Sequence, residues 1–415
     1  MSITRNTPAL MLAPVTAAMA LSGHAHADFI ADSKASLQMR NFYFNSDYRQ
    51  PGARQSKREE WAQGFILDVK SGYTEGAIGF GVDAIGLLGV KLDSSPDRTN
   101  TGLLPIDNDG RAPDEYSQLG LTAKARLSKS TLHVGTLMPK LPTLRPSDSR
   151  LLPQTFRGAH LVSEEISGLR FNLGRMTQNS LRNYASSDDM SVTGKGIRGG
   201  QPSDRFDFGG VRYDWGSGLA TSYDYAQLER NYRQHIVNIT HLLPIAEGQS
   251  LASDIRYAHS TDDGNTNVDN GAFGAMFTYN LSAHAFTLAY QKMSGGSGYP
   301  YVNGTDAFLV NYSMLSPDFA NPNEKSWQAR YDYDFSSLGA PGLLFSVRYV
   351  KGDGFEWADG SNGREWERNL DLRYTIQSGP LKNLGLRWRN AISRSNGGND
   401  LDQNRLILSY TLPLL

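Results

Sequence analysis

The sequence predicts an all-β protein, an 18-stranded antiparallel transmembrane β-barrel with short periplasmic turns and inward-folded extracellular loops. Three observations predict this fold. Apolar and polar residues alternate with period two in segments along the whole chain. The connections between these segments alternate between short and mostly longer ones. The composition combines 42 glycines, 20 tyrosines and no cysteine with 39% hydrophobic residues, which suits a large sheet in which every second residue is polar.

The alternation is clearest in five segments. Residues 121–128, 326–335, 369–377, 384–389 and 405–412 each place apolar side chains on one face and polar side chains on the other. A soluble β-sandwich would also alternate in this way. Aromatic residues toward the ends of the apolar faces favour a membrane barrel, because such barrels carry aromatic girdles at both interfaces.

The connections predict the number of strands. Short turns fall near 71–76, 128–131, 164–168, 214–218, 243–250, 280–284, 335–342 and 377–383. Mostly longer loops fall at 45–60, 87–117, 137–157, 177–205, 228–234, 259–271, 293–326, 351–366 and 395–403. Eight turns on one side and nine loops on the other correspond to 18 strands.

One further segment has the features of a nineteenth strand. Residues 306–314, DAFLVNYSM, have the length and composition of a strand. An odd number of strands would put the two chain ends on opposite sides of the membrane, which single-chain bacterial barrels avoid. We therefore assign this segment to the long loop 293–326, folded inward.

The N-terminus predicts export. Arg5, an apolar run at 9–21 and the small-x-small site Ala25-His26-Ala27 are typical of a signal peptide at 1–27. Residues 28–415 are then expected to form a single β-barrel domain. Export without an apolar helical span leaves a periplasmic, a secreted or an outer-membrane protein, and the alternation favours the last.

Charge and motifs exclude several functions. With 41 Lys and Arg against 42 Asp and Glu, no basic surface for nucleic acid is expected. The absence of cysteine removes thiol catalysis and Cys-based zinc sites. No catalytic motif is present, so the protein is predicted not to be an enzyme and to need no cofactor and no metal. Loose calcium binding by the acidic segment 262–271 stays open.

The alternation also predicts which charged side chains face the lumen, because residues of the same parity, odd or even, lie on the same face of a strand. A cation on the lipid face at mid-membrane costs roughly 2–4 kcal/mol. Eight arginines are therefore expected to face inward: Arg40, Arg126, Arg330, Arg348, Arg373, Arg387, Arg389 and Arg405. Five aspartates should accompany them: Asp83, Asp224, Asp254, Asp332 and Asp371.

Arg387 and Arg389 carry the sharpest functional prediction. They lie two residues apart on one face, about 7 Å along the strand. Two adjacent unpaired cations are costly, which indicates that something anionic visits them. The alternative is that lumenal charges are solvated or paired across the barrel.

The loop 137–157 is a candidate constriction. Its four prolines prevent strand pairing and stiffen it, so we expect it to fold into the lumen rather than to form an extracellular flap. The constricting residues are predicted to be Pro142, Arg145, Ser147, Asp148 and Arg150.

Several long segments carry a family resemblance, among them SLQMRNFYFN (36–45), SRLLPQTFRG (149–158), GAPGLLFSVRY (339–349) and IQSGPLKNLGLRWRN (376–390). With these segments the whole mature chain resembles the OprD-type outer-membrane carboxylate channels of pseudomonads. The resemblance implies an 18-stranded monomeric barrel, a lumen narrowed by loops and an arginine-rich basic ladder. Arg126, Arg373, Arg387, Arg389 and Arg405 match ladder positions, and Arg348 and Arg40 join them on the expected conduction path.

Within the family, residues 28–45 and 92–105 look most similar to the branch that takes cyclic and aromatic carboxylates. The resemblance therefore implies passive, substrate-selective uptake of small carboxylate-bearing solutes, cyclic or aromatic ones such as benzoate or vanillate. The alternatives are a channel for basic amino acids and small peptides, an outer-membrane barrel hydrolase, and a barrel used for adhesion or assembly. The expected partners are these solutes, outer-membrane lipid or lipopolysaccharide, and the barrel-assembly machinery, with no nucleic acid. The expected location is the outer membrane of a Gram-negative bacterium, as a monomer or a weak trimer.

Overall fold

The computed structural model describes residues 29–415 except 51–52, 54, 316–317 and 399. The predicted signal peptide, residues 1–27, lies outside the described residues. Within the described part of the chain, no helix is long and apolar enough to cross a membrane.

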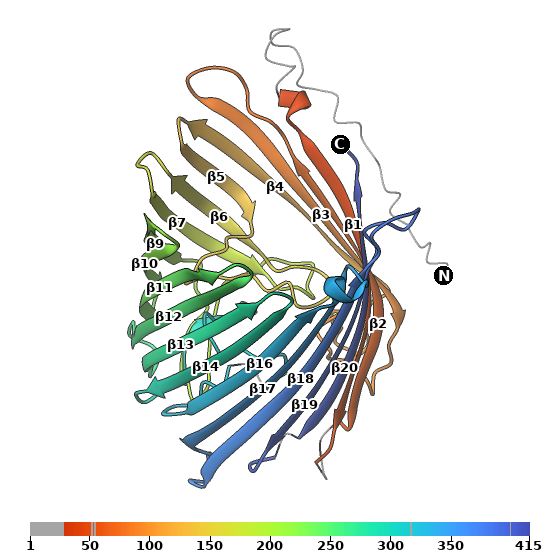
Figure 1. Cartoon of the computed structure of the whole chain (residues 1–415), viewed down its shortest axis with the longest axis vertical. Helices are drawn as coiled ribbons and strands as arrows, with labels where there is room; N and C mark the ends of the chain where they lie inside the picture. Colours follow the sequence, from red (N-terminus) through yellow and green to blue (C-terminus); the bar gives the residue numbers. More distant parts are fainter. Residues whose placement is uncertain (1–28, 51–52, 54, 316–317, 399) are drawn as a thin grey trace, which may run out of the picture.

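The fold prediction is confirmed: in the described residues, 18 antiparallel strands form one closed barrel (Figure 1). The barrel strands are β1 (Lys34–Tyr48), β2 (Lys57–Lys70), β3 (Gly79–Asp93), β4 (Glu115–Leu127), β5 (Ser130–Leu137), β6 (Thr155–Ser163), β7 (Leu169–Ser180), β9 (Phe206–Gly216), β10 (Leu219–Leu228), β11 (Tyr232–Ala246), β12 (Gln249–Asp262), β13 (Asp269–Leu281), β14 (His284–Ser294), β16 (Lys325–Asp334), β17 (Leu343–Glu356), β18 (Asn362–Thr375), β19 (Gly385–Ser395) and β20 (Leu401–Pro413). The short strands β8 (Val192–Thr193) and β15 (Tyr301–Val302) pair only with each other.

The first and last strands close the barrel. Arg40 of β1 lies opposite Gly64 of β2 on one side and opposite Ser409 of β20 on the other. The start of β1 and the end of β20 therefore lie at one end of the barrel, as the even strand count requires. A closed sheet leaves no edge with unpaired backbone groups, which is the condition for strands to cross a membrane.

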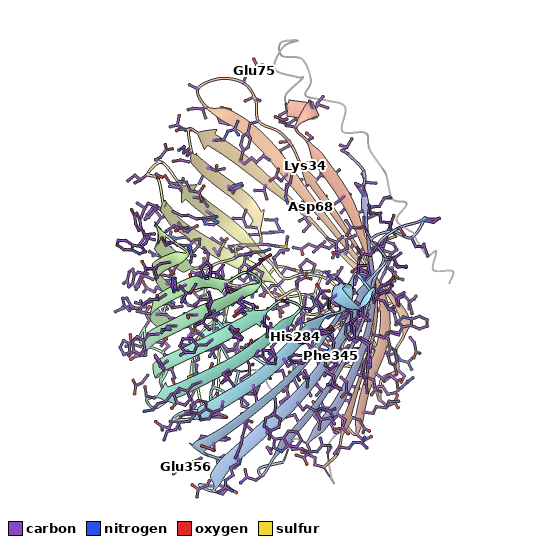
Figure 2. The ribbon with its side chains drawn as sticks, viewed as in Figure 1. Lys34, Asp68, Glu75, His284, Phe345 and Glu356 are labelled. Carbon is purple, nitrogen blue, oxygen red and sulfur yellow. The ribbon has the colours of Figure 1, made fainter. Side chains whose placement is uncertain are left out.

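The connections alternate as predicted. One end of the barrel carries the short turns 71–78, 128–129, 164–168, 217–218, 247–248, 282–283, 335–342 and 376–384. The other end carries the outer loops L1 (49–56), L2 (94–114), L3 (138–154), L4 (181–205), L5 (229–231), L6 (263–268), L7 (295–324), L8 (357–361) and L9 (396–400). Figure 2 places Glu75, in a short turn, and Glu356, beside L8, at opposite ends of the barrel.

Some outer loops are shorter than predicted, because the strands continue past the length that the bilayer needs. β1 and β11 each have 15 residues, whereas a tilted strand crosses the hydrocarbon with about 9–11. The tightest turns are two residues long. In one of them Ser217 and Gly218 have φ angles of 49° and 78°, the left-handed pair that a type I′ hairpin turn requires.

The two faces of β19 illustrate the predicted parity. Leu386 and Trp388 are 45% and 41% exposed on the outer face, where lipid covers them in the membrane. Ala391, of the opposite parity, is fully buried. Arg387 and Arg389 share the inward parity of Ala391.

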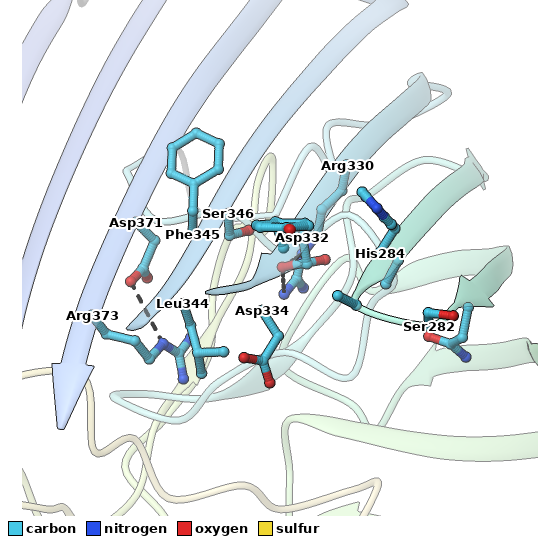
Figure 3. Close-up of a pocket in the computed structure, with 14 residues that line it drawn as sticks. Ser282, His284, Arg330, Asp332, Asp334, Leu344, Phe345, Ser346, Asp371 and Arg373 are labelled. Carbon is cyan, nitrogen blue, oxygen red and sulfur yellow. Dashed lines mark hydrogen bonds and ion pairs between the residues drawn. The ribbon is translucent and has the colours of Figure 1, made fainter. Parts of the chain in front are cut away.

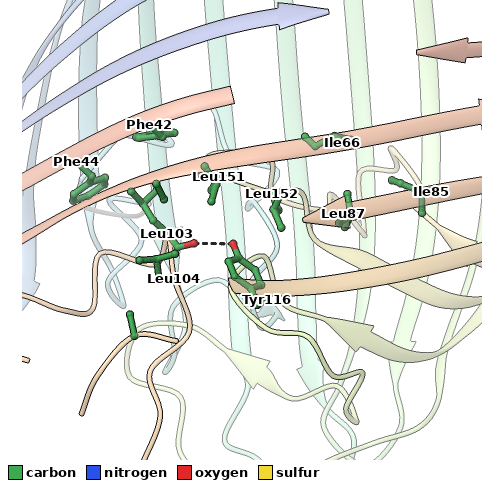
Figure 4. Packing of buried hydrophobic residues seen from close by; sticks show 12 residues of the cluster. Phe42, Phe44, Ile66, Ile85, Leu87, Leu103, Leu104, Tyr116, Leu151 and Leu152 are labelled. Carbon is green, nitrogen blue, oxygen red and sulfur yellow. Dashed lines mark hydrogen bonds between the residues drawn. The ribbon is translucent and has the colours of Figure 1, made fainter. Parts of the chain in front are cut away.

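The buried apolar residues lie where outer loops pack against the inner wall. Phe42 and Phe44 of β1 and Ile66 of β2 meet leucines from L2 and L3 (Figure 4). The hydroxyl of Tyr116 on β4 donates to the carbonyl of Leu103 in L2 at 2.7 Å. The loops are therefore packed inside the barrel, and the expectation of inward-folded extracellular loops is confirmed.

Candidate conduction site

Three outer loops meet inside the barrel. The backbone N–H of Asp306 in L7 donates to the carbonyl of Arg145 in L3 at 2.8 Å. L4 joins them through Arg182, whose Nη1 donates to Ser147 Oγ of L3 at 2.9 Å. β8 of L4 also pairs with β15 of L7. The three loops thus form one hydrogen-bonded unit that narrows the lumen.

L7 is tied to the inner wall by two arginines. Arg348 Nη1 of β17 donates to the Tyr312 carbonyl at 2.9 Å. Arg405 Nη2 of β20 donates to the Met314 carbonyl at 3.0 Å. Residues 306–314 are not a strand, and the prediction that they belong to an inward-folded loop is confirmed.

L3 is held by Arg40 of β1. Its Nη1 lies 2.7 Å from Asp148 Oδ1 and donates to the Arg150 carbonyl, also at 2.7 Å. Because a charge-assisted hydrogen bond is about twice as strong as a neutral one, this contact fixes the loop against the wall. In this structure Arg40 acts on the position of L3, and its predicted role on the conduction path stays a prediction.

Four of the predicted conduction residues line one cavity. Its volume is about 170 Å³, and it lies between Met314 of L7 and the inner faces of β16–β19. These four residues are Arg348, Arg373, Arg387 and Arg389, and Arg330 lines the same cavity.

One carboxylate, that of Asp371, serves three of these arginines. Arg387 Nε lies 2.9 Å from Asp371 Oδ1, and Arg389 Nε lies 3.1 Å from Asp371 Oδ2. Arg373 Nε lies 3.9 Å from Oδ1. The expectation that Arg387 and Arg389 are unpaired is therefore wrong, because parity fixes the face of a side chain but not its cross-strand partner. Three guanidinium groups against one carboxylate still leave the cavity positive.

A second cavity lies beside the positive one, toward the periplasmic end. This second cavity has a volume of about 300 Å³ and shares Arg330, Asp371 and Arg373 with the first (Figure 3). Asp332 and Asp334 also line it, and Arg330 pairs with Asp332 at 2.7 Å. A solute leaving the arginines therefore reaches a mixed environment in which acidic groups compete for the same guanidinium groups.

The structure separates the other two ladder arginines from the cavity. Arg405 is only 1% exposed and lies over the Phe44 ring at 4.9 Å. Its Nε donates to Gln403 Oε1 at 2.7 Å. Arg126 is exposed near the periplasmic end of β4, over the Tyr73 ring at 4.2 Å. Arg126 lines neither of the two cavities that hold the other arginines, and its role on the conduction path stays a prediction.

The predicted constriction residues have different environments. Arg145 and Asp148 are exposed, Pro142 and Arg150 are half-buried, and Ser147 is buried. Arg150 lies over the Phe44 ring at 5.0 Å and donates to the Thr101 carbonyl at 2.9 Å. Burial and the neighbouring charge of Arg182 together lower the pKa of the Arg150 guanidinium to about 9.

The inward aspartates pair with neighbours. The pairs are Lys124 with Asp83 (2.6 Å), Arg256 with Asp254 (2.6 Å) and Arg330 with Asp332 (2.7 Å). Asp224 is buried and accepts from Ser222 Oγ at 3.2 Å. Four of the five predicted inward aspartates, Asp371 included, thus pair with a cation.

Sequence reasoning missed Arg182 and Glu367. Arg182 connects L4 to L3, but it lies in a loop without alternating residues, so the alternation gave no prediction of where its side chain points. Glu367 of β18 is buried and accepts from the Met314 backbone N–H at 3.0 Å. Its inward parity, shared with Asp371, was the signal that could have found it.

The site offers charge and shape rather than reactive chemistry. Among the described residues no group of three or more His, Cys, Asp or Glu side chains could hold a metal ion. A closed barrel whose charged lumen is narrowed by inward loops has the architecture of an outer-membrane pore, in which rings or columns of charge select what passes.

The comparisons with known proteins agree with this class. The model of the family "outer membrane porin, OprD family" matches residues 27–414, and the chain belongs to this family. It is similar to Porin D of Pseudomonas aeruginosa PAO1, with 39% identity over 419 residues, covering 93% of this chain and 92% of that protein.

Two crystal structures from Pseudomonas aeruginosa are also similar. OpdQ has 56% identity and a TM-score of 0.87, covering 94% of this chain and all of that chain. OpdK with vanillate has 41% identity and a TM-score of 0.85, covering 93% of this chain and all of that chain. The protein is thus an outer-membrane porin for small-solute uptake, a channel rather than an enzyme.

Proposed function

We propose that this porin selects small solutes that carry a carboxylate, in particular cyclic or aromatic acids such as benzoate or vanillate. The observation that carries the proposal is the cavity in which Arg373, Arg387 and Arg389 share the single carboxylate of Asp371. The similarity to OpdK, whose crystal structure contains vanillate, supports the aromatic part of the proposal.

The geometry accounts for entry and release of a carboxylate. An anion that enters the narrowed lumen loses part of its water, which costs several kcal/mol unless charge-assisted hydrogen bonds replace that water. Arg387 is 35% and Arg389 is 20% exposed in the side chain, so their free N–H groups are accessible to a solute. Asp371 weakens the attraction of these arginines for the solute carboxylate. Conduction requires sites that bind a solute weakly enough to release it.

The constriction and the partners belong to the same proposal. Arg145, exposed on L3, presents a positive charge to an entering solute, while Asp148, paired with Arg40, and Pro142, Ser147 and Arg150 hold the loop in place. We propose that residues 1–27 are a signal peptide, that residues 28–415 are one domain, and that the barrel-assembly machinery inserts the chain as a monomer or weak trimer among outer-membrane lipid and lipopolysaccharide.

The test is uptake of a carboxylate and of its amide into liposomes that contain the purified porin. In Arg387→Gln/Arg389→Gln, hydrogen bonding is largely kept and two charges are lost. We expect benzoate uptake to fall about tenfold, roughly 1.4 kcal/mol in the rate-limiting barrier, with benzamide nearly unchanged.

A matched control is Arg212→Gln, which removes a cation from β9 on the wall opposite β19. This control should leave the benzoate-to-benzamide ratio unchanged. An unchanged ratio in the double variant would refute the role of the arginines. Faster uptake of arginine than of benzoate by the wild type would favour the channel for basic amino acids instead.

A further inference from the structure

A basic patch lies on the outer face of the barrel, at the extracellular ends of β14, β16, β17 and β18, which are consecutive in the barrel wall (Figure 1). It consists of Lys292, Lys325, Lys351, Arg364 and Arg368. The parity is clear on β16, where Trp327, two residues from Lys325, is 64% exposed, while Ser326 is fully buried.

Two of these lysines face each other. Lys292 and Lys325 are Cα partners across β14 and β16, and both are exposed. Like charges directly opposite each other on a sheet are destabilising. In the described residues neither lysine makes an ion pair, although Asp353 is the other cross-strand partner of Lys325.

Asp353 of β17 is a carboxylate within the patch, and Glu356 is exposed at the end of the same strand. Asp353 lies opposite Lys325 on one side and opposite Arg364 on the other. It forms no ion pair with either in the described part of the chain. Five cations against these two carboxylates leave the patch positive.

Aromatic rings fix the level of the patch in the membrane. Tyr290 and Trp327 have ring centroids 4.5 Å apart, and Tyr349 and Trp366 have centroids 5.7 Å apart. Trp327 and Trp366 are the two cross-strand partners of Lys351. Because aromatic girdles of barrels sit at the headgroup level, the patch faces the headgroups of the outer leaflet.

Arg368 extends the patch below that level. It lies two residues beyond Trp366 on the same face, opposite Tyr349. Its Nη2 donates to Asn390 Oδ1 at 2.7 Å, while its Nε is buried and has no hydrogen-bond partner. A cation toward the hydrocarbon is costly, so an anionic partner at this site would stabilise the barrel.

We propose that the patch binds a bisphosphorylated glycolipid of the outer leaflet, the chemistry of the lipid A headgroup of lipopolysaccharide. The unpaired lysines and Arg364 supply charge-assisted hydrogen bonds for phosphate oxygens at the headgroup level. The aromatic rings and the apolar outer face below them cover sugar and acyl chains. This site lies outside the lumen and does not depend on the proposed solute.

The test measures lipid A on the purified porin in phosphatidylethanolamine nanodiscs that contain a minority of bisphosphorylated lipid A. Native mass spectrometry counts the retained lipid, and displacement of labelled lipid A gives its affinity. We expect Lys325→Gln/Lys351→Gln to weaken binding about tenfold. Asp353→Asn removes the competing carboxylate and should strengthen binding.

The matched control is Arg175→Gln/Arg233→Gln, which removes two exposed outer-face cations that already pair with Asp207 and Asp263. It should bind lipid A as the wild type does, and all variants should migrate on gels as folded barrels and conduct benzoate equally. Equal lipid A affinity in the wild type and the Lys325/Lys351 variant would overturn the proposal. Displacement of lipid A by inorganic phosphate at similar concentration would also overturn it, because the site would then bind a free anion.

Discussion

Asp371 is expected to set how long a carboxylate stays in the lumen. Its carboxylate occupies Arg387 and Arg389 and lies near Arg373, so it competes with any solute for the same groups. Asp371→Asn keeps the size of the side chain and removes the charge. We expect the variant to bind benzoate longer at each visit and to release it more slowly.

The magnitude follows from Coulomb's law. A solute carboxylate on the far edge of a shared guanidinium lies roughly 7 Å from that of Asp371. Two unit charges at this distance repel by about 0.6 kcal/mol in bulk water and by about 2.4 kcal/mol at an effective dielectric constant of ~20. Because the lumen lies between these limits, the dwell time should lengthen by about tenfold, which corresponds to ~1.4 kcal/mol.

The assay is single-channel recording in a planar bilayer, with the dwell time of benzoate-induced blocks as the readout. Asp332→Asn is the matched control, since Asp332 is a lumenal acid that pairs with Arg330 and has no ion pair with Arg387 or Arg389 in the described residues. The control should lengthen the blocks far less. If Asp371→Asn leaves the dwell time unchanged or shortens it, solutes do not share the arginines with Asp371 and the proposed conduction path is wrong.

Three further outcomes are expected. Leu386→Arg should impair assembly by about 2–4 kcal/mol, because Leu386 faces lipid; the yield of folded barrel on gels measures this, and Leu386→Met should assemble normally. Shortening L3 within 139–150 should raise conductance and reduce discrimination between benzoate and benzamide, since this loop lies inside the lumen; unchanged conductance would assign the constriction to L7. Burial raises the pKa of Asp318 in L7 to about 7, so the stability that its protonated form contributes is present at acidic pH and is lost as the pH rises through about 7. After correction for the intrinsic pH dependence of amide exchange, the protection of L7 amides should therefore fall as the pH rises from about 4 to about 7 in the wild type, and Asp318→Asn should remove that fall.

The period-two pattern predicted the wall of the barrel well, because side chains of a strand must alternate between lipid and lumen. It placed Arg387, Arg389 and Asp371 on the inner face, where the structure has them. It could not predict that Asp371 is their shared partner, because register depends on strand pairing and not on the pattern within one strand. The pattern also grouped Arg405 with the accessible arginines, because alternation within one strand does not show that the loop L7 covers this side chain in the folded barrel.

The loops were predictable only where a strong local signal exists. Four prolines marked L3 as a segment that cannot join the sheet, and the even strand count assigned 306–314 to L7. Contacts such as that of Arg182 with Ser147 join residues far apart in the chain, and no periodic pattern encodes them. Loop placement is decided by these long-range hydrogen bonds and by packing against Phe42 and Phe44.

The pairing of β1 with β20 constrains the order in which the barrel can form. This seam joins residues from opposite ends of the chain, such as Ser36 with Pro413 and Tyr48 with Leu401. Every other pair of neighbouring barrel strands is also consecutive along the chain, so it can form as soon as both strands have been synthesised. The last seam waits for the final strand, so a chain that stops before β20 exposes two unpaired edges together. Its synthesis must be complete before the wall can seal, and until then the sheet needs protection from pairing with other chains.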